Sequence, residues 1–298
     1  MWLKMSQNEA FFLDTNILIK WIYREILNEN PAVEDFIDSL SKGQCVILHI
    51  NLREFETIIY DAYNITSHVI YEKILSKQDW DKLGVEDKLR VLEDIRKNFE
   101  QIYEQILTKY YNGQILPGGI RQILAKRFFI ELEGKLIDSN LEALRNHIAL
   151  NQRTDDLIDY ISGIENTIRK NCTILNNINL LFNDDIIKEN QLIYEGISKY
   201  IRNLKSKRCN KTPSRNDQII FVYLFLLLRG RIYDKIVFIT DDNDFERMHN
   251  TVLNHLKDII NGNANPRGDF KESAIEANDI LRKLVIKGIN DLITQQKS

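Results

Sequence analysis

Four acidic residues lie at the ends of apolar segments that are far apart in the sequence: Asp14, Glu54, Asp217 and Asp242. Carboxylates at the carboxyl ends of parallel strands converge on the crevice where such sheets bind ligands. Several carboxylates in one crevice repel one another unless a divalent cation lies among them. Because carboxylates are hard oxygen ligands, the preferred cation would be Mg²⁺ or Mn²⁺. The four positions therefore predict a cation site that the fold assembles from distant parts of the chain.

Strands and helices alternate around the first two acids. Residues 9–14 and 45–50 have the apolar composition of buried strands, and each is followed by a helical pattern. This β-α-β-α order favours a parallel sheet with crossover helices. The α/β pattern resumes near residue 212, and residues 235–240 form another predicted strand. We therefore expect an α/β fold with a central parallel sheet.

Residues 65–210 have a different pattern, because their apolar residues recur at spacings of three and four. Such spacing is typical of amphipathic helices. We predict an all-helical insertion over residues 65–210, packed as a bundle that selects a substrate or partner. This insertion would interrupt one domain formed by residues 1–64 and 211–298. Within that domain, we expect residues 246–298 to be mainly helical.

Composition excludes several classes of protein. The chain has 298 residues and a net charge of −3, so any nucleic-acid-binding surface must be local. Its three cysteines, Cys45, Cys172 and Cys209, have no spacing typical of a zinc site. The odd number of cysteines and the lack of a signal segment predict a reducing, cytoplasmic compartment. The longest apolar run, residues 219–228, is too short to cross a membrane.

Each acid also has a purely structural explanation. Asp14 could cap the helix that follows its strand, and Asp217 could cap a helix in the same way. Asn51 and Glu54 have the spacing of a capping box, and Glu56 is a second candidate for the site glutamate.

Taken together, the acidic positions resemble the PIN-domain nucleases. The matching segments are Leu13-Asp14-Thr15-Asn16, Leu52-Arg53-Glu54-Phe55, Asn216-Asp217-Gln218-Ile219 and Ile239-Thr240-Asp241-Asp242-Asn243-Asp244-Phe245. In the order of the chain, they correspond to four features of the family: a first strand that ends in Asp-x-Asn, a Glu early in the helix after the second strand, an Asp that opens a late helix, and a final Thr-x-Asp-x-Asp-Phe. The resemblance covers residues 9–60 and 212–250, about a third of the chain. It implies a PIN-like, Rossmannoid three-layer domain, although compact members lack the long helical segment.

The resemblance also implies roles for individual residues. The implied catalytic residues are Asp14, Glu54, Asp217 and Asp242, and the implied ligands of one or two Mg²⁺ or Mn²⁺ ions are Asp14, Asp217, Asp242 and Asp244. Such ions activate a water for in-line attack on a phosphodiester and stabilise the leaving oxygen. Asn16 and Thr240 would orient the ligands or the attacking water. The family usually cuts RNA endonucleolytically, and some relatives cut structured DNA.

A basic stretch leads into Asp217 without an intervening acid. Its seven positive residues are Lys199, Arg202, Lys205, Lys207, Arg208, Lys211 and Arg215. These side chains could follow the phosphates of a nucleic acid, with Tyr200 available to stack on a base. The alternative is a solvated loop.

We therefore expect an Mg²⁺- or Mn²⁺-dependent endoribonuclease that acts as a toxin, in RNA processing or in defence. The expected partner is an RNA substrate. A cognate inhibitor or antitoxin protein is a second partner to test for, and the chain could also pair with a second copy of itself as a homodimer. Two interpretations stay open beside it: an inactive PIN-like scaffold and a structure-specific DNA nuclease. A phosphatase of the HAD type would need an Asp where the chain has Asn16. A receiver-like signalling domain would need an acidic pair and a late Lys, and neither is evident.

Overall fold

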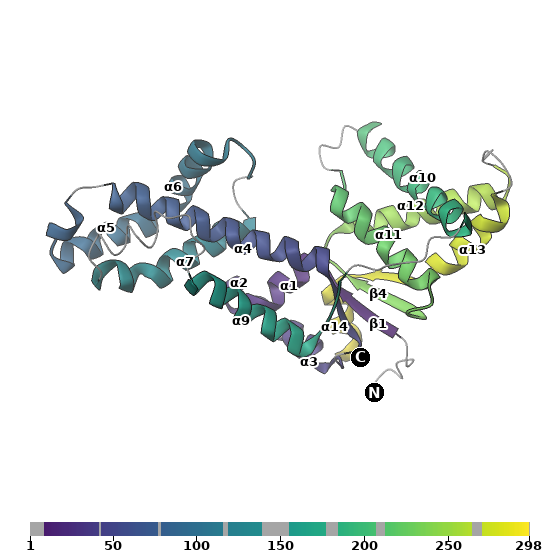
Figure 1. Cartoon of the computed structure of the whole chain (residues 1–298), viewed down its shortest axis with the longest axis horizontal. Helices are drawn as coiled ribbons and strands as arrows, with labels where there is room; N and C mark the ends of the chain where they lie inside the picture. Colours follow the sequence, from purple (N-terminus) through teal and green to yellow (C-terminus); the bar gives the residue numbers. More distant parts are fainter. Residues whose placement is uncertain are drawn as a thin grey trace. The chain divides into compact units, whose positions relative to one another are not determined.

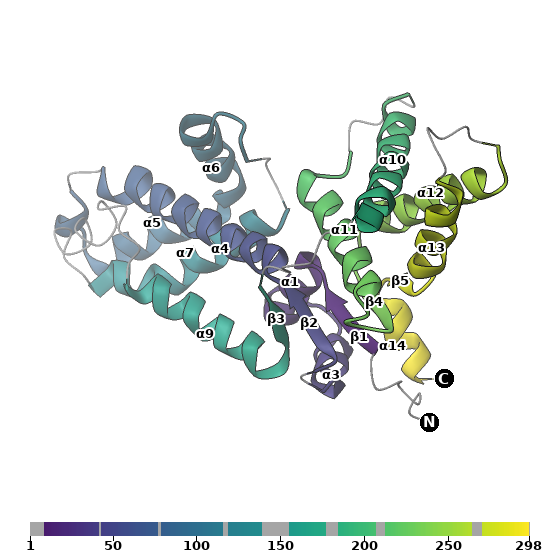
Figure 2. The same ribbon diagram turned by 45° about the vertical axis from the view of Figure 1, so that its right-hand side comes forward.

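The structure is a computed structural model that describes residues 9–41, 43–76, 79–115, 119–138, 155–176, 184–206, 212–263 and 270–297. The chain divides into two compact units. The first contains Met1–Arg53 and Asn166–Ser298, and the second contains Glu54–Glu165. Figures 1 and 2 show their helices and strands.

The first unit contains a five-stranded parallel sheet in the order β3-β2-β1-β4-β5. The strands are β1 (Glu9–Leu13), β2 (Cys45–Leu48), β3 (Thr173–Leu175), β4 (Lys235–Ile239) and β5 (Leu284–Lys287). Leu13 lies opposite Ile239, so β1 and β4 end side by side at the same edge of the sheet (Figure 2). The predicted α/β fold with a central parallel sheet is therefore confirmed.

Helices pack against both faces of this sheet. On one face, Ala10 and Phe12 belong to a buried apolar cluster with side chains of α10 (Asp184–Ser206), α11 (Arg215–Arg229), α12 (Asn243–Ile260) and α13 (Lys271–Leu281). Phe11 points the other way and makes an edge-to-face contact with Phe36, with ring centroids 5.9 Å apart. Successive strand residues face opposite sides of a sheet, and helices cover both sides, so β1 is apolar and buried from Ala10 to Leu13. The other helices of this unit are α1 (Thr15–Ile22), α2 (Arg24–Leu27), α3 (Ala32–Ser39) and α14 (Ile289–Lys297).

The second unit consists of helices and turns over its described residues. It contains most of α4 (His49–Ile70) and of α9 (Asp155–Asn171), with η1 (Tyr71–Leu75), η2 (Trp80–Lys82), α5 (Val85–Lys97), α6 (Phe99–Ile106), η3 (Leu107–Tyr111) and α7 (Gly119–Asp138) between them. The buried Trp80 donates its indole N–H to the carbonyl of Leu136 at 3.2 Å, and Phe99 packs against Phe129. Of the helices in the described ranges, none has both the length and the apolar character to cross a membrane.

Two short strands lie in segments that were predicted to be helical. β3 lies within residues 65–210, so the all-helical prediction is wrong there, whereas the described part of residues 246–298 is mainly helical, as predicted, with β5 as a short strand. The strands have three and four residues, and apolar runs this short carry no periodicity that separates strand from helix. β3 and α10 both belong to the first unit. The segment inserted into this unit is the second unit, Glu54–Glu165, whereas the predicted insertion covered residues 65–210.

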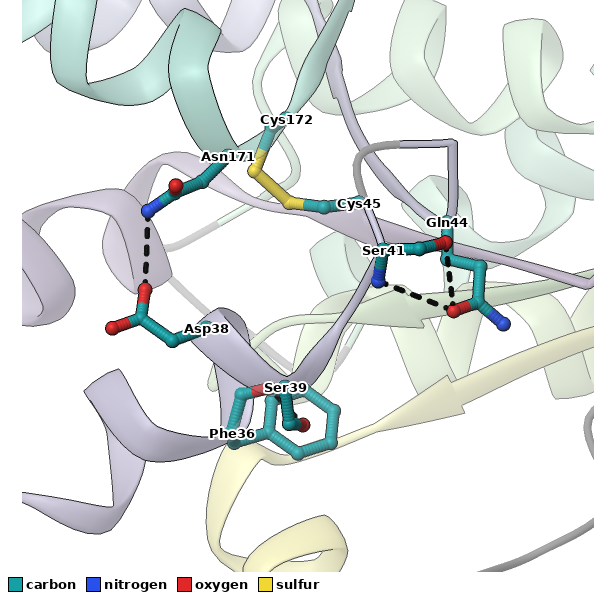
Figure 3. The surroundings of a disulfide bond; sticks show 8 residues. All are labelled: Phe36, Asp38, Ser39, Ser41, Gln44, Cys45, Asn171 and Cys172. Carbon is teal, nitrogen blue, oxygen red and sulfur yellow. Dashed lines mark hydrogen bonds between the residues drawn. A yellow bond between two sulfur atoms is a disulfide. The ribbon is translucent and has the colours of Figure 1, made fainter.

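A disulfide joins the two strands at one side of the sheet. Cys45 is the first residue of β2, and its sulfur is bonded to that of Cys172, which directly precedes β3 (Figure 3). The two Cα atoms are 4.6 Å apart, although 127 positions separate the residues in the sequence. Next to it, the Asn171 amide donates to the Asp38 carboxylate at 3.0 Å. β3 is therefore held to β2 by a covalent bond in addition to the strand ladder, while the cytoplasmic location stays a prediction.

Candidate active site

Asp14 is a buried carboxylate at the carboxyl end of β1, only 6% exposed. Its Oδ1 accepts hydrogen bonds from the backbone N–H of Thr15 at 2.8 Å and from the Asn51 amide at 3.0 Å. Its Oδ2 accepts from the Thr240 hydroxyl at 2.6 Å and from the Asn16 amide at 2.9 Å. Four donors suit an ionised carboxylate, which only accepts. Asp14 is also the N-cap of α1, so the structural explanation from the sequence is confirmed too.

The Thr240 hydroxyl connects Asp14 to the next acid. It donates to Asp14 and accepts the backbone N–H of Asp242 at 3.0 Å. Asn16 reinforces this link, because its amide also lies 3.3 Å from the Thr240 hydroxyl and its Oδ1 accepts the Asp241 N–H at 3.4 Å. Both predicted orienting residues therefore bridge the ends of β1 and β4, two strands that the sheet places side by side.

Asp242 and Asp244 begin α12. Asp242 is its N-cap and accepts the backbone N–H of Asp244 at 2.9 Å. Asp244 accepts the hydroxyl of Tyr200 on α10 at 2.9 Å. Tyr200 is buried in the apolar core, so the prediction that its ring stacks on a base is wrong. Burial first, and then the hydrogen bond to Asp244, raises the pKa of Tyr200 well above its ordinary value.

Asp217 lies in the first turn of α11 and forms a capping box with Ser214. The Ser214 N–H donates to the Asp217 carboxylate at 2.6 Å, and the Asp217 N–H donates to the Ser214 hydroxyl at 3.0 Å. The predicted capping role is therefore confirmed. Burial raises the pKa of Asp217, the hydrogen bonds from Ser214 lower it, and the negative charges of Asp242 and Asp244 raise it further. Asp217 is therefore close enough to both acids to repel them.

Asp241, in contrast, is part of an ion pair. The Lys20 ammonium lies 2.9 Å from its carboxylate and 3.3 Å from that of Glu29. Burial lowers the pKa of Lys20, but the hydrogen bonds and charges of the two carboxylates outweigh it and raise the pKa overall. Asp242 rather than Asp241 therefore continues the network from Asp14.

Glu54 and Glu56 both lie on α4, in the part that belongs to the second unit. Glu54 is half-buried and Glu56 is buried. α4 already begins at His49, and no described residue donates a hydrogen bond to the Oδ1 atom of Asn51. The capping-box explanation for Asn51 and Glu54 is therefore wrong. Glu54 stays the predicted site glutamate, with Glu56 as the second candidate.

Asn51 is the site residue that sequence reasoning missed. Its spacing to Glu54 suggested a helix cap, whereas its amide donates to Asp14, which lies 37 positions earlier. The only available signal was its place directly after a predicted strand that neighbours the strand of Asp14.

The basic stretch is described in part. Lys207, Arg208 and Lys211 lie outside the described residues. Lys199, Arg202 and Lys205 follow one another along the last turns of α10, and exposed Arg215 is the first residue of α11, two positions before Asp217. Lys199 lies 3.1 Å from the carboxylate of Asp258, so this cation is already paired.

A polar cavity of about 300 Å³ lies beside the network, at the carboxyl ends of β4 and β5. Its lining residues are Thr240, Asp241, Asp242, Asn243, Glu246, Ile286, Lys287, Gly288, Asn290 and Asp291. Asp242 therefore links the buried Asp14 network to a space that a ligand can enter.

The predicted metal ligands do not form a closed cage. In the described ranges, no three His, Cys, Asp or Glu side chains are grouped so that they could hold a metal ion. Mg²⁺, however, usually keeps several of its waters and is bound through one or two carboxylates. Partly exposed Asp242 and Asp244 offer hard oxygens of this kind. The residues therefore fit a hydrated ion on one or two carboxylates, with Asp14 and Asp217 beside them.

Comparison of the chain with protein-family models, with curated proteins and with solved structures gave no match. The assignment of a function therefore depends on the residues at the carboxyl edge of the sheet.

Proposed function

We propose that the protein is an Mg²⁺- or Mn²⁺-dependent endoribonuclease of the PIN type. The observation that carries the proposal is the chain of hydrogen bonds from Asp14 through Thr240 to Asp242. It joins acids from two distant segments at the ends of adjacent parallel strands, where α/β sheets bind ligands. The repulsion of Asp217 by Asp242 and Asp244 adds support, because a bound cation would relieve it.

Each residue has a defined task in this proposal. When bound, the cation supplies an acidified water and stabilises negative charge on the phosphodiester. Asp242 and Asp244 would hold the hydrated ion, and the Tyr200 hydroxyl donates a hydrogen bond that orients the Asp244 carboxylate. Asp14, held by four donors, contributes a fixed negative charge beside them. Asp217 ionises at a higher pH than an ordinary Asp, so the attraction for the cation grows as the pH rises through that range.

The direct test is cleavage of labelled RNA by protein stripped with EDTA and then supplied with Mn²⁺ or Mg²⁺. We expect cleavage only with the metal, and a rate at least ~10²-fold lower for Asp242→Asn and Asp14→Asn. Asp35→Asn is the matched control, because Asp35 is an exposed acid on α3. Full activity in excess EDTA would overturn the proposal. Single-stranded and structured DNA of the same sequence distinguish a DNA nuclease.

An inactive PIN-like scaffold is the second candidate. The observation that favours it is the saturation of Asp14, whose two oxygens already accept four hydrogen bonds from the protein. Calorimetric titration with Mn²⁺ separates the two functions. A nuclease binds Mn²⁺ and loses that affinity in Asp242→Asn, whereas a scaffold binds RNA in EDTA and does not cut it when metal is added.

A further inference from the structure

We propose that Arg247 is a substrate-binding residue of this site, whose guanidinium takes the RNA phosphate that lies next to Asp244. The residue lies outside the basic stretch from Lys199 to Arg215 that the sequence pattern singles out. This inference rests on the proposed function, because it names a contact between the same site and the same substrate.

Arg247 lies in the second turn of α12, three positions after Asp244. Its guanidinium is 4.0 Å from the Asp244 carboxylate, measured from nitrogen to oxygen. The side chains of a helix tilt toward its amino end, so a long side chain at this position reaches back over the first turn. The guanidinium therefore lies at the end of α12 that begins with Asp242 and Asp244.

The guanidinium of Arg247 has hydrogen-bonding capacity left for a ligand. A separation of 4.0 Å from Asp244 is too long for a hydrogen bond, and no acceptor in the described part of the chain takes one of its N–H groups. The side chain is 64% exposed. A guanidinium carries five N–H donors in a planar fork that matches the oxygens of a phosphate. Arg247 can therefore bind a phosphate without breaking a hydrogen bond to the protein.

The same turn of α12 meets α10 within the basic stretch. The Tyr200 hydroxyl donates to Asp244 at 2.9 Å, which places this part of α10 beside the first turn of α12. Arg202 and Lys205 follow Tyr200 by two and five positions on α10, and both are exposed. An RNA strand that contacts the end of α10 can therefore reach Arg247 where Tyr200 meets Asp244.

A phosphate that approaches these acids needs a cation there. Asp217, Asp242 and Asp244 repel one another, as the raised pKa of Asp217 indicates, and they repel a phosphate in the same way. Lys20, a second cation near the acids, is already paired with two other carboxylates. An exposed pair at the distance between Arg247 and Asp244 contributes little to stability. The position of Arg247 is therefore better explained by a substrate than by the fold.

The test measures the affinity of the protein for labelled single-stranded RNA in EDTA, by fluorescence anisotropy over a range of salt concentrations. EDTA makes the measurement independent of cleavage. We expect Arg247→Gln to lower RNA affinity by roughly 10-fold or more, because a charged contact to phosphate is lost. The slope of log affinity against log salt concentration should fall by about 0.7, the value for one phosphate of a single strand.

Arg282→Gln is the matched control. Arg282 is also an exposed arginine of the first unit, but it lies just before β5, at the edge of the sheet opposite to the site. This variant should keep the RNA affinity and the salt slope of the wild type. Arg247→Lys retains the charge without the planar fork, so it should keep the slope and lose part of the affinity. Both Arg247 variants should melt at the temperature of the wild type.

Equal RNA affinity and equal salt slope in Arg247→Gln and Arg282→Gln would overturn the role of Arg247 alone. A lower melting temperature that accompanies the loss of affinity would assign Arg247 a structural role and would also overturn the contact. Failure of the proposed function has a different signature: the wild type does not cut RNA when Mn²⁺ is added, although Arg247→Gln still weakens RNA binding in EDTA. A wild type that binds no RNA in EDTA would overturn the contact as well.

Discussion

The Thr240 hydroxyl is the most informative single group to remove, because it makes three hydrogen bonds in the site. Valine has nearly the same shape, so Thr240→Val deletes the hydroxyl from a side chain that is 4% exposed without leaving a large cavity. The variant loses the bond to the Asp14 carboxylate at 2.6 Å and those from the Asp242 N–H and the Asn16 amide.

The size of the effect follows from these partners. A hydrogen bond to a charged group contributes about 1.5–3 kcal/mol, and a neutral one contributes about 0.5–1.5 kcal/mol. Asp242 and Asn16 are partly exposed and can bond to water instead, so the Asp14 bond dominates. We therefore expect Thr240→Val to lower the free energy of unfolding of the first unit by about 2–4 kcal/mol at pH 7.

Urea denaturation in EDTA, followed by tryptophan fluorescence, measures this change. Trp21 is buried in the first unit and Trp80 is buried in the second. In a Trp80→Phe background the two remaining tryptophans, Trp2 and Trp21, both belong to the first unit, so the fluorescence reports on that unit. The control is Thr251→Val, whose hydroxyl donates to the Arg247 carbonyl within α12 and whose effect should stay within about 0.5 kcal/mol. A loss below about 1 kcal/mol for Thr240→Val would refute the importance of this hydroxyl.

Three further predictions concern the charged residues. Folding raises the pKa of Asp217 above 3.8, so the protonated carboxyl contributes to the stability of the folded protein below that pH, and this contribution is lost as the pH rises through the folded pKa. Melting curves from pH 3 to 7 should therefore show that Asp217→Asn gains stability relative to the wild type as the pH rises. Glu54→Gln should slow RNA cleavage by at least ~10-fold at an unchanged melting temperature, and the same result for Glu56→Gln instead would identify Glu56 as the site glutamate. Replacing Lys205, Lys207 and Arg208 by Ala should flatten the salt dependence of RNA affinity by up to ~2–3 units of slope, whereas Lys97→Ala should not.

The strands that carry the acids could be predicted from the sequence, because each of them is a continuous apolar run ending at a polar residue. β1, β2 and β4 were found in this way, together with the caps formed by Asp14 and Asp217. These features depend on neighbouring residues, and local sequence describes them well.

The features that were missed depend on contacts between distant segments. Asn51 has the spacing of a helix cap, and only the pairing of β1 with β2 reveals that Asp14 takes its amide. Tyr200 lies next to basic residues in the sequence, yet the packing of α10 on α12 buries its ring and directs its hydroxyl to Asp244. Tertiary packing decided both cases, and neither has a signature in residue spacing.

The disulfide between Cys45 and Cys172 also determines how the protein responds to a protease. The whole second unit, Glu54–Glu165, lies between the two bonded cysteines. A single cut anywhere in that unit therefore breaks the backbone but leaves one covalent molecule, which migrates as two fragments only after reduction. One fragment carries β1 and β2 and the other carries β3, β4 and β5, so after a cut in the second unit all five strands still belong to one covalent molecule.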